Sequence, residues 1–258
     1  MEKPFNPFSL EGKNIIVTGA SSGIGRQCAI DCSKAGARVI AIARNKERLE
    51  ETLSMMDGEG HHYYSYDLSD SQGIAELVST IVSECGKIGG MIYAAGIEKT
   101  LPFKLLKPED YSELFNVNTI SALEMAKSVS SVKNFCKSET GGGIVLIASI
   151  TASIARNGTA AYTASKGAMV SASRVLASEL AARKIRVNCI SPGTILTPLM
   201  QNYLDQLSEE NYKKRIGGFP LGLGETTDVS NACIFLLSDA SRWITGQNII
   251  IDGGFTIQ

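Results

Sequence analysis

The residues with the clearest chemical potential are a tyrosine and a lysine four positions apart, Tyr162 and Lys166. They fall in a segment with helical patterning, where side chains at this spacing share one face. An unperturbed tyrosine titrates near pH ~10, which is too high for proton transfer at neutral pH, but a nearby ammonium favours the phenolate. The pair therefore predicts a phenol that exchanges protons beside a lysine. An exposed pair without function would show the same short pattern.

Two further polar residues can be placed relative to this pair. Ser149 ends a predicted strand, and ligands of open α/β sheets bind at the carboxyl ends of the strands. Its hydroxyl could hold a substrate oxygen beside Tyr162. Asn118 lies in a helical stretch, where an asparagine is more often solvated or capping, and it becomes a functional candidate only together with the other motifs.

A glycine-rich turn, TGASSGIG at 18–25, joins the first predicted strand to the first predicted helix. Glycines allow the backbone to approach a diphosphate, and the free N–H groups at the start of a helix attract it. The turn predicts dinucleotide binding, although a simple tight turn is the alternative. The candidate cofactor residues here are Gly19, Ser21, Ser22, Gly23, Ile24 and Gly25.

The end of the second predicted strand bears on the choice of cofactor. NAD enzymes commonly place an acidic residue there to bind the adenosine ribose, whereas this chain has Ala43 followed by Arg44. A guanidinium suits the 2′-phosphate of NADP. We therefore expect NADP(H) in preference to NAD(H); the alternative is that Arg44 stacks on adenine or faces solvent.

Short apolar runs alternate with helical patterns along the whole chain, which predicts repeated βα units and a parallel sheet. We expect one doubly wound α/β domain over 1–258, with a seven-stranded parallel sheet flanked by helices. The predicted strands are Asn14–Thr18, Arg38–Ala43, His61–Tyr66, Met91–Ala94, Ile144–Ser149, Arg186–Ile190 and Asn248–Ile251. The predicted helices are Gly25–Lys34, Ser71–Glu84, Tyr111–Lys137, Tyr162–Ala182 and Asp228–Leu237. The region of about 194–224 departs from this alternation and is a lid candidate.

Bulk composition excludes several classes of function. The net charge of −1 over 258 residues gives no general attraction to nucleic acid or to an anionic membrane. The six cysteines stand singly, and we expect no metal site. Because the first residues lack a signal-peptide pattern and no apolar stretch is long enough to span a membrane, we expect a soluble, cytoplasmic protein.

Together, TGASSGIG, Asn118, Ser149 and the segment from Tyr162 to Lys166 resemble the short-chain dehydrogenase/reductase family. The resemblance covers about 10–255 and is similar to the branch that contains 3-oxoacyl-carrier-protein reductases. It implies a seven-stranded Rossmann-type sheet, usually in a homotetramer. It also implies that Ser149 and Tyr162 are catalytic, that Lys166 binds the nicotinamide ribose, and that Asn118 holds a water in the proton path.

The same resemblance implies further cofactor contacts. Asp67 and Leu68 match the adenine position, and Pro192, Gly193, Ile195 and Thr197 match a segment near the carboxamide and diphosphate. Ala94, Ala95 and Gly96 lie at the family's Asn-Asn-Ala-Gly position, where this chain has Tyr93-Ala94-Ala95-Gly96. The missing amides weaken the hydrogen bonding expected there, which concerns sheet support more than chemistry.

The sequence thus predicts an oxidoreductase that acts on CH–OH or C=O groups of a small carbonyl or alcohol substrate with NADP(H). A ketone or 3-oxoacyl reductase with Tyr162 as general acid or base is favoured. The alternatives are a sugar or other alcohol dehydrogenase that uses NAD(H), or a non-catalytic protein that senses NADP(H). A sugar-nucleotide epimerase fits less well, since such enzymes generally need an added substrate domain. The substrate pocket is expected among Glu98–Phe103, Ile150–Asn157 and Leu199–Tyr212, where Arg156, Leu199, Met200, Tyr203 and Leu207 are candidate contacts.

Overall fold

Seven parallel strands form the centre of the molecule. The computed structural model describes residues 6–137 and 141–258. Neighbouring strands follow the order β3-β2-β1-β4-β5-β6-β9, and each neighbouring pair is parallel. The strands are β1 (Asn14–Thr18), β2 (Arg38–Ala43), β3 (His62–Ser65), β4 (Gly90–Tyr93), β5 (Gly142–Ile147), β6 (Ile185–Pro192) and β9 (Asn248–Ile251). This confirms the predicted sheet.

The inner strands β1, β4 and β5 are buried on both faces because helices cover both sides of the sheet. Successive residues of a strand point to opposite faces, so Ile16 packs in one hydrophobic core while Ile15 and Val17 pack in the other. All five residues of β1 are buried. A run of consecutive β-branched residues, rather than an alternating pattern, is therefore what this central strand requires.

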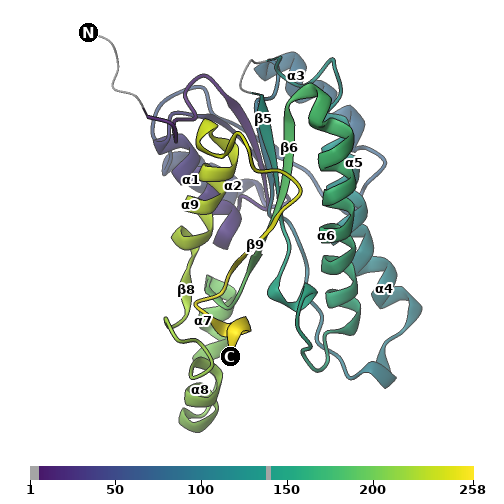
Figure 1. Ribbon diagram of the computed structural model, residues 1–258, viewed down its shortest axis with the longest axis vertical. Helices are drawn as coiled ribbons and strands as arrows, with labels where there is room; N and C mark the ends of the chain where they lie inside the picture. Colours follow the sequence, from purple (N-terminus) through teal and green to yellow (C-terminus); the bar gives the residue numbers. More distant parts are fainter. Residues whose placement is uncertain (1–5, 138–140) are drawn as a thin grey trace.

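Two groups of helices cover the two faces of the sheet (Figure 1). On one side lie α1 (Gly23–Lys34), α2 (Lys46–Ser54) and α9 (Thr226–Leu237). On the other lie α3 (Ile74–Cys85), α4 (Pro108–Phe115), α5 (Ser121–Val129) and α6 (Ala160–Leu180). The described residues also form five short 3₁₀ turns: Phe103–Leu105, Ile150–Ala152, Ala181–Arg183, Asp239–Ser241 and Phe255–Ile257.

The predicted continuous helix Tyr111–Lys137 is wrong. The chain instead forms α4, a π-helical segment over Asn116–Ile120, and then α5, which ends at Val129. Within the π-helical segment the main-chain oxygen of Val117 accepts a hydrogen bond from the hydroxyl of Tyr93. The side chain of Asn118 bonds to the main chain of Ile97. These tertiary bonds compete with regular α-helical hydrogen bonding, which the local sequence pattern does not reveal.

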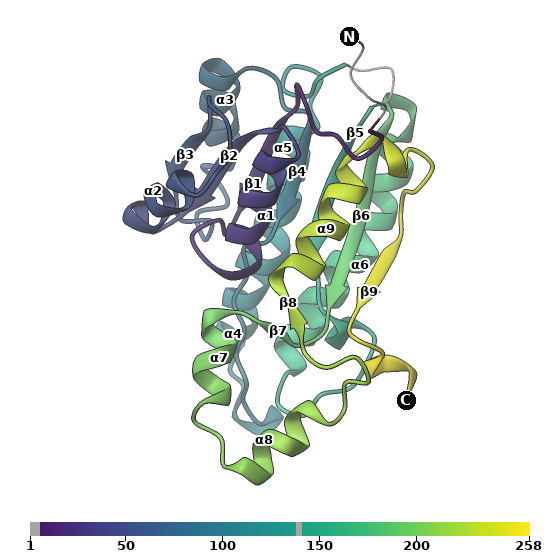
Figure 2. The same cartoon turned by 90° about the vertical axis from the view of Figure 1, so that its left-hand side faces the viewer.

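The lid candidate consists of two short helices closed by a small sheet. Strands β7 (Ile195–Leu196) and β8 (Gly224–Glu225) pair in parallel and hold the two ends of the segment together. Between them lie α7 (Pro198–Leu204) and α8 (Glu209–Ile216), which extend beyond the carboxyl ends of the central strands (Figure 2). A β-carbon at Gly224 would lie 2.6 Å from Cδ1 of Ile195, so a larger residue there would have to displace the end of this side chain.

Other differences from the predicted elements are small. Helix α2 was not predicted, because its strongly charged sequence has only Leu49 and Thr52 fully buried. Ser149 lies two residues beyond the end of β5 rather than inside it. None of the helices in the described ranges is both long and apolar enough to cross a membrane. Among the same residues, no group of three or more His, Cys, Asp or Glu side chains could hold a metal ion.

Candidate active site

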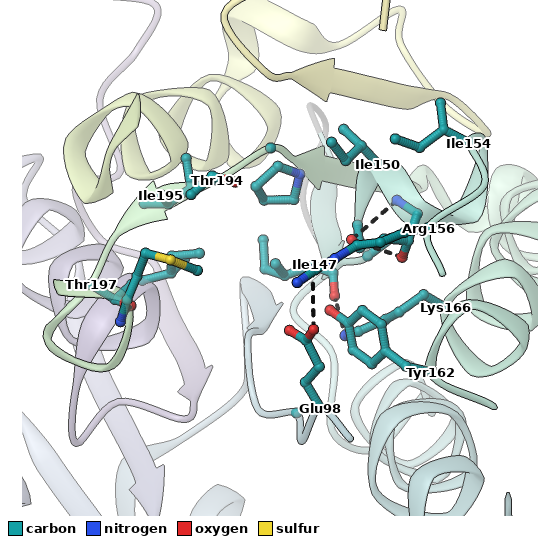
Figure 3. A pocket seen from close by; sticks show the side chains of 18 of the residues that line it. Glu98, Ile147, Ile150, Ile154, Arg156, Tyr162, Lys166, Thr194, Ile195 and Thr197 are labelled. Atoms are coloured by element: carbon teal, nitrogen blue, oxygen red, sulfur yellow. Dashed lines mark hydrogen bonds and ion pairs between the residues drawn. The ribbon is translucent and has the colours of Figure 1, made fainter. Parts of the chain in front are cut away.

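A cavity of about 360 Å³ opens at the carboxyl ends of the strands, between the loops after β4 and β5, helix α6 and the lid segment. Ser149, Tyr162 and Lys166 all line it, and Figure 3 shows Tyr162 and Lys166 there. Of the predicted cofactor residues it also includes Ile24, Ala94, Gly96, Pro192, Gly193, Ile195 and Thr197. The structure therefore brings together in one cavity residues that are more than 150 positions apart in the chain.

Ser149 lies in the turn that follows β5, and its hydroxyl has a defined direction. It caps the 3₁₀ turn Ile150–Ala152, where Oγ accepts a hydrogen bond from the N–H of Thr151 over 3.2 Å. The hydroxyl of Thr151 donates to the same oxygen over 3.0 Å. A serine oxygen has two lone pairs, so its own hydrogen is left to donate to Tyr162 or to a substrate. Thr151 is a contact that the sequence did not predict.

Tyr162 and Lys166 lie on the first turns of α6, on the face that borders the cavity. The Nζ atom of Lys166 is 5.9 Å from the centroid of the tyrosine ring. The lysine is 4% exposed, and its ammonium donates a hydrogen bond of 2.7 Å to the main-chain oxygen of Ile147. The end of β5 therefore positions the lysine as well as Ser149.

The electrostatics of this pair differ from the expectation. Burial raises the pKa of Tyr162 to about 12 and the charge of Glu98 adds to the effect, although the hydrogen bond to Ser149 and the charge of Arg156 oppose it. Burial also lowers the pKa of Lys166 to about 8. Desolvation is thus the largest influence on both pKa values, and for Tyr162 it opposes the expected stabilisation of the phenolate. At neutral pH the phenol is protonated and can act as a proton donor.

Asn118 lies behind the lysine, fully buried in the π-helical segment. Its amide oxygen accepts from the N–H of Ile97 over 2.8 Å, and its amide nitrogen donates to the oxygen of Ile97 and to Oγ of Ser165. A β-carbon at Gly96 would lie 3.1 Å from the Asn118 oxygen and 3.3 Å from Nζ of Lys166. Asn118 therefore fixes the loop after β4 against α6, close to the lysine.

Tyr93 and Ala94 stand where the family has two asparagines, and other hydrogen bonds are present there in place of those of the asparagine amides. The Tyr93 side chain is fully buried, and its hydroxyl donates to the main-chain oxygen of Val117 over 2.8 Å. The N–H groups of Ala94 and Ala95 both donate to the hydroxyl oxygen of Thr18 over 3.1 Å. Tyr93 thus ties β4 directly to the segment that contains Asn118, and the expected weakening of local hydrogen bonding is not observed.

The glycine-rich turn provides a cradle that side chains would fill. A β-carbon at Gly25 would lie 2.3 Å from the oxygen of Gly19, and one at Gly19 would lie 2.9 Å from the nitrogen of Ala95. Gly23 has a φ of 53° and is the first residue of α1. The side chain of Ser22 makes no capping bond to this helix. The backbone around Ser21–Gly25 therefore suits a diphosphate, whose oxygens take the N–H groups of the first turn.

The adenosine side of the predicted cofactor site lies beyond β2 and β3. Arg44 follows β2 and is exposed. The Asp67 carboxylate accepts a hydrogen bond from the N–H of Ser69, which lowers the pKa of Asp67, and the charge of Arg44 contributes in the same direction. The side chain of Leu68 is buried in the core. Its main chain, rather than its side chain, is therefore the group available to a nucleotide.

The segment after β6 closes the cofactor side of the cavity. Thr197 caps α7 by accepting a hydrogen bond from the N–H of Met200 over 3.2 Å. Its Cγ2 would lie 3.1 Å from a β-carbon at Gly23, so the starts of α7 and α1 face one another. Gly193 is close to Asp252, and a side chain there would lie within 2.9 Å of the Asp252 main chain.

The remaining wall of the cavity combines apolar side chains with one ion pair. Arg156 and Glu98 line the cavity and form an ion pair of 3.2 Å. Leu199 and Met200 also line it, as predicted. Tyr203 and Leu207 do not belong to the described lining, and Tyr203 is 47% exposed. Apolar residues that were not singled out by name complete the wall: Ile97, Ile154 and Phe255.

Comparison with known proteins agrees with this architecture. A family model described as enoyl-(acyl carrier protein) reductase matches residues 19–256. The chain is 34% identical to D-threitol dehydrogenase of Mycolicibacterium smegmatis, with 97% of this chain and 95% of that protein aligned. It is also 34% identical to the 3-oxoacyl-[acyl-carrier-protein] reductase FabG of Thermotoga maritima, over 96% of this chain and 99% of the relative.

A solved structure shows the same fold. A 7α-hydroxysteroid dehydrogenase, determined in complex with NADH and 7-oxo glycochenodeoxycholic acid, superimposes with a TM-score of 0.88 at 29% identity. The alignment covers 97% of this chain and 98% of that one. The chain therefore belongs to the short-chain dehydrogenase/reductase family. It is an oxidoreductase of alcohol and carbonyl groups that uses a nicotinamide cofactor.

Proposed function

We propose that the protein is an NADP(H)-dependent reductase of ketones or 3-oxoacyl groups, with Ser149, Tyr162 and Lys166 as catalytic residues. The observation that supports this most directly is the orientation of Ser149. Both of its acceptor positions are taken by Thr151, so its hydrogen, which bonds to Tyr162 here, can turn to a carbonyl oxygen beside the protonated phenol.

The residues act on a single oxygen atom. Ser149 donates a hydrogen bond to the substrate carbonyl and holds it next to the phenol. NADPH, when bound, supplies the hydride that reaches the carbonyl carbon. Tyr162 gives its proton to the carbonyl oxygen, so that a C–H and an O–H bond form while the C=O double bond becomes single. Lys166, held by the oxygen of Ile147, keeps a positive charge close to the phenol as the proton leaves.

Asn118 has a supporting role in this proposal. It binds the loop after β4 to Ser165 on α6, next to the lysine. We assign it to the path by which a proton returns to Tyr162 through Lys166.

Cofactor preference rests on a single exposed cation. Arg44 directly follows β2 and is exposed, and a guanidinium can bind the 2′-phosphate of NADP with two parallel hydrogen bonds. An NAD(H)-dependent alcohol or sugar dehydrogenase is the second candidate, since the superimposed hydroxysteroid dehydrogenase was determined with NADH. We also propose that Asp67, Leu68 and Ala95 contact the cofactor.

The test is a panel of ketones and 3-oxoacyl thioesters, followed by the loss of NADPH absorbance. We expect turnover with the wild type and a loss of at least about 100-fold in Tyr162→Phe, with NADPH binding retained. Tyr63→Phe is the control, because the Tyr63 hydroxyl bonds to Glu50 at the outer edge of the sheet. A Tyr162→Phe enzyme that keeps its turnover contradicts the assignment, and a wild type that binds NADPH without reducing any member supports a non-catalytic sensor.

The assembly that we propose is a homotetramer. Several exposed apolar side chains provide surface that association would bury, and they include Val132, Val175, Trp243 and Ile257. Light scattering of the purified protein tests this, and a mass close to the 27.5 kDa of one chain would contradict it.

A further inference from the structure

The ion pair between Glu98 and Arg156 spans the substrate side of the cavity. Glu98 belongs to the loop after β4, and Arg156 to the loop that follows the 3₁₀ turn Ile150–Ala152. Their Oε1 and Nη1 atoms are 3.2 Å apart. Figure 3 shows the two side chains reaching toward one another beside Tyr162. The pair therefore lies where a substrate must pass or bind in order to reach the phenol.

Both members of the pair act on the reactive phenol. Apart from burial, the negative charge of Glu98 raises the pKa of Tyr162, and the positive charge of Arg156 lowers it. Among the described residues that line the cavity, the charged ones are Glu98, Arg156 and Lys166. Because Lys166 is buried and bonded to Ile147, the other two are the charges that a substrate meets.

Apolar side chains form much of the remaining lining of the cavity. Ile150, Ile154, Leu199, Met200 and Phe255 form an apolar surface that suits a carbon skeleton. A substrate that fits this site therefore has an apolar part and a polar group close to the reacting carbon. The charges of the pair decide which polar group that is.

We propose that Glu98 and Arg156 together bind a hydroxyl group on the carbon next to the carbonyl, and that the substrates are neutral α-hydroxy ketones, with vicinal diols as the reduced products. This inference rests on the function proposed above. A hydroxyl is both donor and acceptor, so it can donate to Glu98 and accept from Arg156. The two opposite charges remain close to one another, with the hydroxyl bonded to both.

Other polar groups fit this pair less well. A carboxylate would compete with Glu98 for Arg156 and would place two negative charges around one cation. An unsubstituted ketone would cover the pair without offering a hydrogen bond in return. Opening of the pair by a hydroxyl costs little, because the side chains of Arg156 and Glu98 are 36% and 40% exposed and such pairs contribute little to stability.

The test compares three methyl ketones that differ in the group next to the carbonyl. Acetoin has a hydroxyl there, methyl isopropyl ketone has a methyl in its place, and pyruvate has a carboxylate. With NADPH, we expect kcat/KM for acetoin to exceed those for the other two by about tenfold or more.

Matched variants assign this preference to the pair. Glu98→Gln keeps the shape of the side chain but removes its charge. We expect the ratio of kcat/KM for acetoin to kcat/KM for methyl isopropyl ketone to fall to about threefold or less. Because Arg156 is then free, kcat/KM for pyruvate should rise by about tenfold. Arg156→Gln should lower kcat/KM for acetoin without raising kcat/KM for pyruvate. Lys99→Gln is the control, since Lys99 pairs with Asp110 outside the cavity lining and the three values should keep their ratios.

The outcomes separate this inference from the proposed function. Reduction of methyl isopropyl ketone or pyruvate as well as or better than acetoin overturns the inference and leaves the reductase function standing. An acetoin preference that survives in Glu98→Gln also overturns it. If NADPH binds but none of the three ketones, nor any bulkier ketone, is reduced, the proposed function fails as well. Turnover of bulkier ketones alone overturns only the inference.

Discussion

The hydroxyl of Thr151 donates a hydrogen bond of 3.0 Å to Oγ of Ser149, which precedes it by two residues in the same turn. The N–H of Thr151 reaches the same oxygen over 3.2 Å. Thr151 thereby determines which way the hydrogen of Ser149 points, although it is not itself proposed to contact the reacting carbonyl. The turn after β5 thus contains a catalytic candidate and the residue that orients it.

Removal of this second hydroxyl should weaken catalysis more than cofactor binding. We expect Thr151→Val to lower kcat/KM for a ketone by about tenfold, which corresponds to the loss of one hydrogen bond, while the Kd for NADPH stays the same. Thr151→Ser keeps the hydroxyl and should remain close to the wild type. Steady-state kinetics on both variants check this, and a loss in Thr151→Ser as large as that in Thr151→Val would contradict the orienting role of the hydroxyl.

Tyr93 should affect both stability and rate. In Tyr93→Phe the main-chain oxygen of Val117 loses its buried donor, and we expect the free energy of unfolding to fall by about 1–3 kcal/mol. Because the Asn118 segment is then less firmly held, kcat should fall as well. Urea denaturation and steady-state assays measure the two effects.

The control for Tyr93 is a second tyrosine that also donates to a main-chain oxygen. The Tyr66 hydroxyl donates to the oxygen of Asp70 over 2.7 Å, away from the cavity, and Tyr66→Phe should leave kcat unchanged. If Tyr93→Phe loses stability but keeps its full kcat, then Tyr93 supports the sheet without helping to position Asn118.

The pH dependence of reduction should follow Lys166 rather than Tyr162. With a pKa of about 8, Lys166 loses its charge at mildly alkaline pH, whereas Tyr162, with a pKa of about 12, remains protonated. We expect kcat/KM for ketone reduction to decline as pH rises through about 8. In Lys166→Arg, which is slower but always charged, this decline should disappear. A decline at the same pH in the variant would assign it to another group.

Lys166 should also make the free energy of unfolding depend on pH, and this quantity should rise with pH where kcat/KM falls. Its folded pKa of about 8 lies below its ordinary value of 10.5, so the unfolded chain binds more protons between these two pH values. The contribution of Lys166 to the free energy of unfolding therefore rises with pH in this window and is unfavourable below it. Lys166→Met should be more stable than the wild type at pH 7, with the difference narrowing toward pH 10, as urea titrations at several pH values would show.

Cofactor preference should depend on Arg44. We expect Arg44→Ala to lower kcat/KM for NADPH by about tenfold or more, because charge-assisted hydrogen bonds to the 2′-phosphate are lost, and to leave the value for NADH nearly unchanged. Arg48→Ala is a matched control, since Arg48 is also exposed and lies on α2 shortly after Arg44. Equal losses with both cofactors would assign Arg44 to adenine stacking.

Much of the fold could be predicted from sequence because the strands are short, apolar and separated by turns. The placement of Ser149 near a strand end, and of Tyr162 and Lys166 on one face of a helix, could also be predicted from the pattern of strands and from helical spacing. Helix α2 was not predicted because its apolar face is narrow, with only Leu49 and Thr52 buried. The break at Asn116–Ile120 escaped because it arises from contacts with β4 and α6, which are distant in sequence.

The parts of the site that could not be predicted depend on tertiary contacts. The oxygen of Ile147, which holds Lys166, is a main-chain atom without a sequence signature. Glu98 and Arg156 are separated by 58 positions, and only the fold brings them together. The raised pKa of Tyr162 follows from burial, which a two-residue pattern does not report.

The short pairing of β7 with β8 has an evolutionary consequence. After β6 ends at Pro192, the excursion begins at Leu196 and closes at Gly224, where the pairs Ile195–Gly224 and Leu196–Glu225 hold its two ends together. For such a closed excursion, doubling the number of residues costs only about 0.6 kcal/mol in closure entropy. Insertions, deletions or whole grafts between the two anchor points can therefore reshape the mouth of the enzyme while the catalytic scaffold stays untouched, which makes this stretch the natural place to exchange when a new specificity is wanted.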